Sequence, residues 1–343
     1  MERGAKPIVS VVQIGLGPIG LGIARMVLAR HDLQLIAAVD IDPAKIGRDV
    51  GDLAGVPSCG VTVSPQLDAE SCRGATTGIV ATSSRIADVA ITLERCIQAG
   101  MHVVSTCEQL AYPWPTEPEL ARRIDDHAAA RGVVVLGTGV NPGFLMDILP
   151  AILTAPCAHV DRIRVERFQD AADRRPPFQA KIGVGLDGDE FDRRRQAGTL
   201  GHVGFPESVH LLADSVGLGP VTVAESIEPV FASGRTGWSA RSPGTEGAVA
   251  GLRQRAVGYR NDEPVVELEL QAFVGHPDPR DTVVIRGTPD VTWTAPGGVN
   301  GDIGTCAITV NALPIVMSAR PGLRTMRDVA PITCGRPPDA GPT

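Results

Sequence analysis

The chain has 343 residues, of which 43% are hydrophobic and 21% are charged, and its net charge is −7. This length exceeds that of most single domains, so we expect two domains with cores of ordinary globular composition. No cluster of Lys and Arg is interleaved with aromatic residues, which argues against a nucleic-acid partner. The run Arg193-Arg194-Arg195 is too short to change this and is typical of a solvated helix face.

Two further features concern the cellular setting. The first predicted strand follows Met1 so closely that a signal peptide is not expected, and no apolar run is long enough to span a membrane. The seven cysteines are scattered, without C-x-x-C or Cys/His metal spacing. We therefore expect a cytoplasmic enzyme with reduced cysteines, no bound metal and no membrane partner.

A glycine-rich turn follows the apolar stretch Ile8 to Ile14 and precedes residues 18 to 30, whose apolar positions keep helical spacing. A strand that feeds a helix through G-x-G-x-x-G is typical of dinucleotide binding. The first glycine allows a tight turn, the second admits the pyrophosphate, and the third lets helix and strand pack closely. The cofactor-binding residues predicted here are Gly15, Gly17, Pro18, Ile19 and Gly20.

Asp40 ends the second predicted strand, Leu33 to Val39. An acidic residue at this distance from the glycines can accept hydrogen bonds from the adenosine ribose, which favours NAD over NADP. Lys45 and Arg48 lie close behind and could accept a 2′-phosphate. The cofactor is therefore predicted as NAD(H), NADP(H) or both. The alternative, a glycine-rich turn without a nucleotide, explains less of the pattern.

The next elements continue as strand, helix and strand with short connections. Strands are predicted at Thr77 to Thr82, His102 to Ser105 and Val133 to Leu136, the last of this domain. Ser84 is expected to cap the first intervening helix, and Thr116 with the glutamate three residues on forms a capping box for the second. This arrangement predicts a doubly wound parallel sheet of the Rossmann type.

The hydrophobic period changes in the second half of the chain. Asn141-Pro142-Gly143 is expected to open a helix, and from His159 the pattern alternates as in strands. Further strands are predicted at Pro220 to Ser226, Gly247 to Val257, Pro264 to Val274 and Thr282 to Thr288, with helices near Asp189 to Gln196 and Glu207 to Val216. They indicate an α+β domain built on an open, mainly antiparallel sheet.

The predicted boundaries follow from this change. Residues 1–142 form the dinucleotide-binding domain, and a helix capped by Asp302 begins the region 302–333 that completes it. Residues 143–301 form a substrate-binding and dimerisation domain. The Pro/Gly-rich residues 334–343 are expected to be a mobile tail.

Ligands of open α/β sheets bind beyond the carboxyl ends of the strands, so the reactive groups are sought there. Glu108 directly follows a buried strand and is flanked by Cys107, Leu110, Tyr112 and Trp114. Such a setting raises the pKa of a carboxylate toward the range useful for proton transfer. Glu108 is therefore the predicted acid and base, the alternative being a surface or helix-capping glutamate, and Cys107 is read as a packed thiol.

Arg167 and Gln169 share parity with Ile163 and Val165, so their side chains are predicted to point into a buried face. A buried arginine requires a partner. Recognition of a polar or carboxylate-bearing substrate is as compatible with this pattern as the alternative, an internal ion pair or exposure at the end of the sheet. Phe168 and Phe178 could belong to the core or to a pocket wall.

Several segments resemble the 2,4-diaminopentanoate dehydrogenase group, which includes the native amine dehydrogenases and whose fold is similar to dihydrodipicolinate reductase. They are Val11 to Gly20, Ser105-Thr-Cys-Glu108 with Tyr112-Pro113, Gly139-Val-Asn-Pro-Gly-Phe-Leu-Met-Asp147, Arg175 to Gly183 and Asn300-Gly-Asp-Ile-Gly-Thr305. The paired histidines of proper dihydrodipicolinate reductases are absent from this sequence.

The resemblance implies NAD(P)-linked interconversion of a primary amine and a ketone or aldehyde plus ammonia, with Glu108 as acid and base. From their position after strand ends, Thr82, Ser83 and Asn141 are predicted to contact the cofactor. The predicted substrate pocket is formed by Phe144, Arg167, Phe168, Gln169, Phe178 and Thr305. Arg167 matches a position that holds a substrate carboxylate, whereas Gln169 is a departure. A diaminopentanoate dehydrogenase proper, a cyclic imine reductase and a non-catalytic nucleotide sensor are the alternatives. Fold analogy suggests a homodimer.

Overall fold

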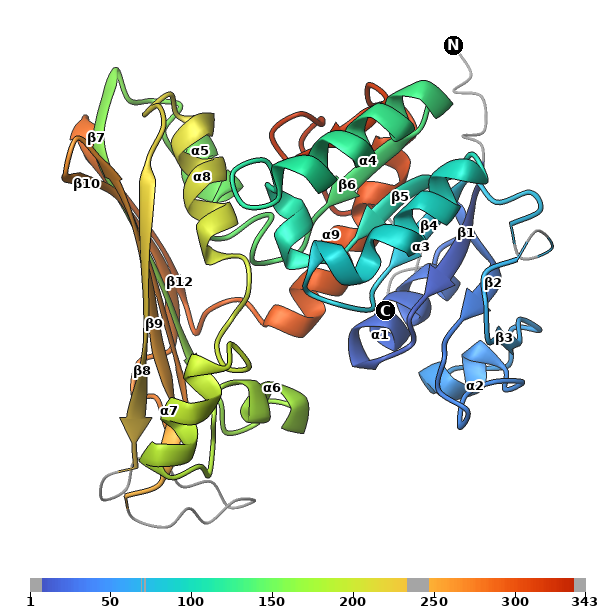
Figure 1. Cartoon of the computed structure of the whole chain (residues 1–343), viewed down its shortest axis with the longest axis horizontal. Helices are drawn as coiled ribbons and strands as arrows, with labels where there is room; N and C mark the ends of the chain where they lie inside the picture. The colour runs from blue at the N-terminus through green and yellow to red at the C-terminus, as the bar shows by residue number, and fades with distance from the viewer. Residues whose placement is uncertain (1–7, 69, 71, 233–246, 336–343) are drawn as a thin grey trace, which may run out of the picture. The chain divides into compact units, whose positions relative to one another are not determined.

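A computed structural model describes residues 8–68, 70, 72–232 and 247–335 of the chain. The chain forms two compact units, of which the first comprises Met1–Phe144 with Asn300–Thr343 and the second Leu145–Val299 (Figure 1). Of the tail predicted at 334–343, only residues 334 and 335 fall within the described residues.

The first unit is built on a seven-stranded sheet in the order β13-β6-β5-β4-β1-β2-β3. All of its pairings are parallel, which confirms the predicted Rossmann type of sheet. The strands are β1 (Val9–Ile14), β2 (Leu33–Val39), β3 (Val63–Ser64), β4 (Thr77–Val80), β5 (His102–Ser105), β6 (Val134–Gly137) and β13 (Gly322–Arg324). The prediction that β6 is the last strand was wrong, because β13 pairs beyond it and is too short to show a period.

The helices of this unit are α1 (Pro18–Leu28), α2 (Val50–Ala54), α3 (Ile86–Gln98), η1 (Glu108–Ala111), α4 (Pro118–Arg131) and α9 (Gly301–Val316). Helices α3 and α4 share a buried cluster with the sheet, in which Leu93 and Ile124 pack with Val103 and Val135. Helix α9 packs against α1 and reaches β5 and β6. The strand-end loops are therefore anchored on a rigid core.

Three predicted helix caps were wrong. Helix α3 begins after Arg85 rather than Ser84, and α4 begins after Glu117 rather than Thr116. The first N–H of α3 is instead bound by the side chain of Gln109, at 3.0 Å, a partner far away in sequence. Helix α9 is capped by Asn300, whose side chain accepts from the N–H of Asp302 and of the next residue.

The second unit contains a six-stranded sheet in the order β12-β11-β7-β10-β9-β8. Strand β7 pairs with β10 in parallel, and every other pairing is antiparallel, which confirms the predicted open, mainly antiparallel sheet. The strands are β7 (His159–Asp170), β8 (Thr222–Phe231), β9 (Val249–Arg260), β10 (Glu263–Phe273), β11 (Arg280–Thr288) and β12 (Val291–Pro296). Strand β12 was not predicted.

The helices of the second unit are α5 (Ile148–Leu153), α6 (Pro176–Lys181), α7 (Gly188–Gln196) and α8 (Phe205–Ser215). Helix α8 packs on β9 so closely that a Cβ at Gly258 would lie 2.6 Å from Val209. The prediction of a helix from Asn141 was wrong, because α5 begins only at Ile148. Its cap is Asp147, which accepts from the N–H of Ile148 at 2.7 Å and from the hydroxyl of Ser208 at 2.7 Å.

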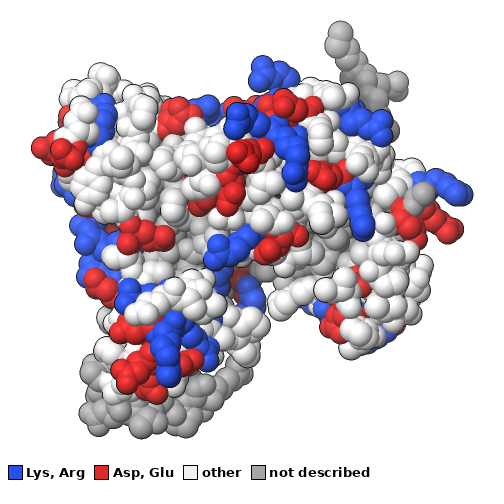
Figure 2. Space-filling model, viewed as in Figure 1, with Lys and Arg blue, Asp and Glu red and all other residues white. Residues whose placement is uncertain are grey.

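Charged side chains of both signs are mixed on the surface in Figure 2. The arginine run on α7 follows this pattern, because Arg193 and Arg194 pair with Glu190, and Arg195 pairs with Asp192. These cations are therefore largely balanced within one helix, as expected for a solvated face. Within the described parts of the chain, no helix is both long and apolar enough to cross a membrane.

Candidate active site at the strand ends of the first unit

One row of paired residues aligns the carboxyl ends of five strands. Ile14 pairs with Val39 on one side and with Val80 on the other. The row continues through Ser105 to Gly137. The loops that follow β2, β1, β4, β5 and β6 therefore leave the sheet at one edge, where ligands of parallel sheets bind.

The glycine loop after β1 has the geometry that a dinucleotide diphosphate needs. Gly15 has φ +88°, and a Cβ there would lie 2.5 Å from the Ala81 carbonyl oxygen. A Cβ on Gly20 would lie 1.9 Å from the Gly15 oxygen, whereas a Cβ on Gly17 would meet nothing within 4 Å. The loop thus packs tightly at its first and third glycines and is open at the second, just before Pro18 and Ile19 begin helix α1.

Sequence reasoning missed a residue that supports this loop. Gln13 lies in the buried strand β1, and its side-chain amide donates to the Gly15 carbonyl at 2.9 Å. The signal was a polar residue within an otherwise apolar strand. The Gly15 carbonyl that Gln13 binds is also the one that Gly20 approaches, so Gln13 stabilises the close packing of the turn.

Asp40 follows β2 and faces the glycine loop. Its Oδ2 accepts from the N–H of Leu16 at 2.6 Å, and its Oδ1 accepts from the N–H of Asp42 at 2.9 Å. Burial opposes the charge of Asp40, but these two N–H groups and the ammonium of Lys45 outweigh it and hold its pKa below the ordinary value. Asp40 is thus an ionised acceptor beside the loop, as a ribose-binding acid must be.

The loop after β4 has two different side chains. The methyl group of Thr82 lies 2.8 Å from the place of a Cβ on Gly15, so Thr82 borders the glycine loop. Ser83 donates its hydroxyl hydrogen to Asp88 at 2.6 Å and accepts from the N–H of Arg85 at 3.3 Å. In this structure the Ser83 hydroxyl is therefore bonded to the N-terminal end of α3.

Glu108 begins η1, directly after β5, and is half-buried. The turn is fixed on both sides. The Ser105 hydroxyl donates to the Val80 carbonyl at 3.0 Å and accepts from the N–H of Cys107 at 3.1 Å. Gly137 packs directly on η1, since a Cβ there would lie 2.4 Å from the Leu110 backbone. Glu108 thus stands on a rigid turn at the ligand edge of the sheet.

Asn141 lies in the loop after β6 and is only 6% exposed. Its side-chain amide nitrogen and oxygen are both buried, and neither has a hydrogen-bond partner among the described residues. A buried amide without partners is costly, so this pair of atoms fits a ligand group that both accepts and donates. The carboxamide of a nicotinamide is such a group.

Thr305 and Phe144 were both predicted as pocket residues. The hydroxyl of Thr305, on α9, accepts from the N–H of Val140 at 3.2 Å, so Thr305 holds the loop that carries Asn141. Phe144 ends the same loop and is half-buried. The first unit therefore brings Glu108, Asn141, Thr305, Phe144 and the glycine loop to the same edge of its sheet.

The remaining predicted residues lie in the second unit. Arg167 and Gln169 are buried, as their parity predicted. Nη1 of Arg167 lies 3.6 Å from Oδ1 of Asp281, and its Nη2 donates to the Val299 carbonyl at 2.9 Å. Burial is the largest influence on both charges: it lowers the pKa of Arg167 and raises that of Asp281 despite their mutual attraction.

Gln169 accepts from Arg174 at 2.8 Å, and the Arg174 guanidinium lies 4.0 Å from the centre of the Phe178 ring. Phe168 is separated from this group, because alternation along β7 turns it to the other face of the sheet, where Arg280 lies over its ring. The predicted pocket residues of β7 therefore divide between two faces. The described residues contain no group of three or more His, Cys, Asp or Glu arranged to hold a metal.

The parallel sheet, the glycine loop and Asp40 are those of a dinucleotide-binding protein, and comparison with known proteins shows an NAD(P)-dependent oxidoreductase. A family profile for the 2,4-diaminopentanoate dehydrogenase C-terminal domain matches residues 144–335. A 2,4-diaminopentanoate dehydrogenase of Acetoanaerobium sticklandii is 33% identical over 341 residues, which cover 94% of this chain and 93% of that protein. The chain therefore belongs to the 2,4-diaminopentanoate dehydrogenase family.

Two further relatives are amine dehydrogenases by name. One, from Streptomyces virginiae, is 24% identical over 354 residues, which cover 94% of this chain and 96% of that protein. The other is the solved structure of the Mycobacterium smegmatis amine dehydrogenase, with 26% identity and a TM-score of 0.83. The likeness covers 97% of this chain and 98% of that one.

Proposed function

We propose that this protein catalyses the reversible, NAD(P)-dependent reductive amination of a small ketone or aldehyde with ammonia, with Glu108 as acid and base. The observation that supports this most is the position of Glu108, a carboxylate on a rigid turn in the row of strand ends that also carries the glycine loop and Asn141. The amine dehydrogenases among the relatives support the same chemistry.

Two proton transfers by Glu108 account for the aminating direction. Its carboxylate takes a proton from ammonium, and the ammonia attacks the carbonyl carbon to give a carbinolamine. The same group then returns the proton to the carbinolamine hydroxyl, so that water leaves and an iminium remains. When bound, the nicotinamide cofactor supplies the hydride that reduces the iminium carbon. Asn141 would orient the cofactor through its carboxamide.

The test is oxidation of NADH and NADPH with a panel of small ketones and aldehydes, with and without concentrated ammonium at alkaline pH. We expect turnover only with ammonium. Glu108→Gln should lower kcat by about 100-fold or more, the usual contribution of a general acid–base group, with cofactor affinity retained. Glu119→Gln, an exposed glutamate on α4, is the matched control. Equal turnover without ammonium would instead indicate a carbonyl or imine reductase.

One observation favours a second candidate, oxidation of a diamino acid. Nη1 of Arg167 is buried and makes no hydrogen bond within the described residues, so it could receive a substrate carboxylate. The 33% identity to a 2,4-diaminopentanoate dehydrogenase points the same way. Reduction of NAD(P)⁺ by 2,4-diaminopentanoate, but not by the matching amine without a carboxylate, would select this candidate.

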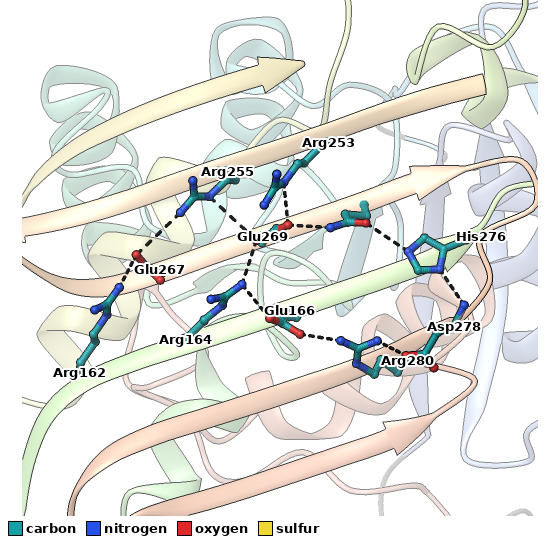
Figure 3. A network of polar contacts seen from close by, with 11 residues as sticks. Arg162, Arg164, Glu166, Arg253, Arg255, Glu267, Glu269, His276, Asp278 and Arg280 are labelled. Atoms are coloured by element: carbon teal, nitrogen blue, oxygen red, sulfur yellow. Dashed lines mark hydrogen bonds and ion pairs between the residues drawn. The ribbon is translucent and has the colours of Figure 1, made fainter. Parts of the chain in front are cut away.

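We also propose that two copies of the chain associate through the charged face of the second unit's sheet. Rows of arginines and carboxylates cross this face (Figure 3), and Glu269 at their centre accepts from Arg253 at 2.7 Å and from Arg164 at 3.2 Å. Alternating charges can match themselves across a two-fold axis. Sedimentation should give a dimer that Arg164→Glu dissociates, whereas Arg193→Glu on α7 should not. A wild-type monomer would refute this association.

A further inference from the structure

A triangle of charged side chains lies behind the glycine loop, in the turn after β2. The ammonium of Lys45 lies 3.3 Å from Oδ2 of Asp40 and 3.2 Å from Oδ2 of Asp42. The backbone fixes this arrangement, because the N–H of Lys45 donates to the Asp42 carbonyl at 2.9 Å. The N–H of Ala44 also donates to Oδ1 of Asp42, at 3.0 Å. The turn therefore brings Lys45 back over the acid that faces the ribose position.

Lys45 is not available to a phosphate in this arrangement. Its side chain is 22% exposed, and it lies between two carboxylates. The backbone N–H of Ala44 and the ammonium of Lys45 both hold the pKa of Asp42 below its ordinary value, so Asp42 stays ionised at neutral pH. Within this triangle, two carboxylates against one ammonium leave one net negative charge, whereas Arg48, the other cation of the turn, is exposed.

This arrangement discriminates between a ribose hydroxyl and a 2′-phosphate. A carboxylate offers about four lone-pair sites. In Asp40, Oδ2 accepts from the N–H of Leu16 and from the ammonium of Lys45, and Oδ1 accepts from the N–H of Asp42. The lone-pair capacity of the Asp40 carboxylate that these donors leave unused suits a ribose hydroxyl. A phosphate monoester, which carries about −1.5 to −2 charges near pH 7, would instead meet net negative charge and a cation already engaged.

We propose that Asp42 sets the cofactor preference toward NAD(H) by holding Lys45 against Asp40. Asp42 is a positioning residue in this account, since it acts through Lys45. The inference concerns cofactor binding alone and does not depend on the amine chemistry proposed above.

The experiment measures the dissociation constants of NADH and NADPH by fluorescence titration of the full-length protein, without substrate. The variant Asp42→Asn keeps the side-chain oxygen that accepts from Ala44 and removes the charge that faces Lys45. We expect it to tighten NADPH binding by about tenfold, the scale of a charge-assisted hydrogen bond, with NADH affinity nearly unchanged. The double variant Asp42→Asn/Lys45→Met should lose this gain.

Asp52→Asn removes one exposed negative charge from helix α2 of the same unit and serves as the matched control. It should leave the ratio of the two constants unchanged. The proposal is overturned if wild-type protein binds NADPH as tightly as NADH. It also fails if Asp42→Asn changes both constants alike, if it leaves NADPH binding unaltered, or if Asp52→Asn produces the same shift. Because substrate is absent, these outcomes are independent of whether Glu108 performs amination.

Discussion

The two sheets of this protein treat buried polar groups in different ways. In the parallel sheet of the first unit, the side-chain nitrogen of Gln13 and the hydroxyl of Ser105 each bond a nearby backbone group. Beyond the end of β6, neither polar atom of the Asn141 side chain has a hydrogen-bond partner within the described residues. In the mixed sheet of the second unit, Arg167 and Asp281 face each other from neighbouring strands. An unsatisfied amide at a strand end fits a ligand. Arg167 and Asp281 balance each other's charge, but Nη1 of Arg167 and Oδ1 of Asp281 lie 3.6 Å apart and make no hydrogen bond within the described residues.

The covering of each sheet explains this contrast. A parallel sheet is buried on both faces, so its polar chemistry is displaced to the loops at one edge. A sheet with one open face can carry charged rows across that face, as Figure 3 shows. The first arrangement places the unsatisfied amide of Asn141 at the edge where ligands of parallel sheets bind, and the second pairs the charges of its open face with one another.

The largest effect on stability is expected from breaking the buried pair in the second unit. Arg167→Met should lower the free energy of unfolding by about 3–5 kcal/mol, because Asp281 is left as an uncompensated buried charge. Its folded pKa then lies further above the unfolded value of 3.8. A carboxyl group whose pKa is raised on folding stabilises the folded state at pH values below its unfolded pKa. This stabilisation is lost as the pH rises through the folded pKa. Denaturant titrations at pH 5 and pH 8 should therefore show the larger deficit at pH 8.

The double variant Arg167→Met/Asp281→Leu is the matched control for this prediction. Replacing both members by apolar side chains should restore part of the stability, since the desolvation cost of the pair disappears. The backbone N–H and carbonyl of Val299 lose their partners in the double variant, which limits the recovery. If the double variant is as unstable as Arg167→Met, the pair is not the cause. If stability returns but a carboxylate-bearing substrate is no longer used, Arg167 has a role in binding as well.

For Asn141 we expect the opposite of Arg167: little effect on stability, and a loss of cofactor affinity. Asn141→Ala should change the free energy of unfolding of the cofactor-free protein by no more than about 1 kcal/mol, because the Asn141 side chain makes no hydrogen bond within the described residues. The affinity for NADH should fall by about tenfold, the value of one or two amide hydrogen bonds. Chemical denaturation with and without saturating NADH measures both effects. A large loss of stability without cofactor would contradict the view that Asn141 serves a ligand.

Much of this architecture could be predicted from local patterns. The glycine loop, Asp40 and the strand before Glu108 combine turn chemistry with hydrophobic period, and both depend on residues close in sequence. The burial of Arg167 followed from alternation along one strand. Helix caps were predicted less well, because Gln109 reaches α3 from another loop.

The sequence by itself determined the period of each element, the dinucleotide-binding loop and the parity that buries Arg167, since all of these depend on residues within a few positions of one another. Only the tertiary structure decided which partners meet: Gln13 beneath the glycine loop, Thr305 on the loop of Asn141, Asp281 beside Arg167, and Lys45 over Asp40. Such contacts arise from strand order, register and the return of α9 to the first unit. These features depend on packing across the whole chain, so a local sequence pattern does not predict them.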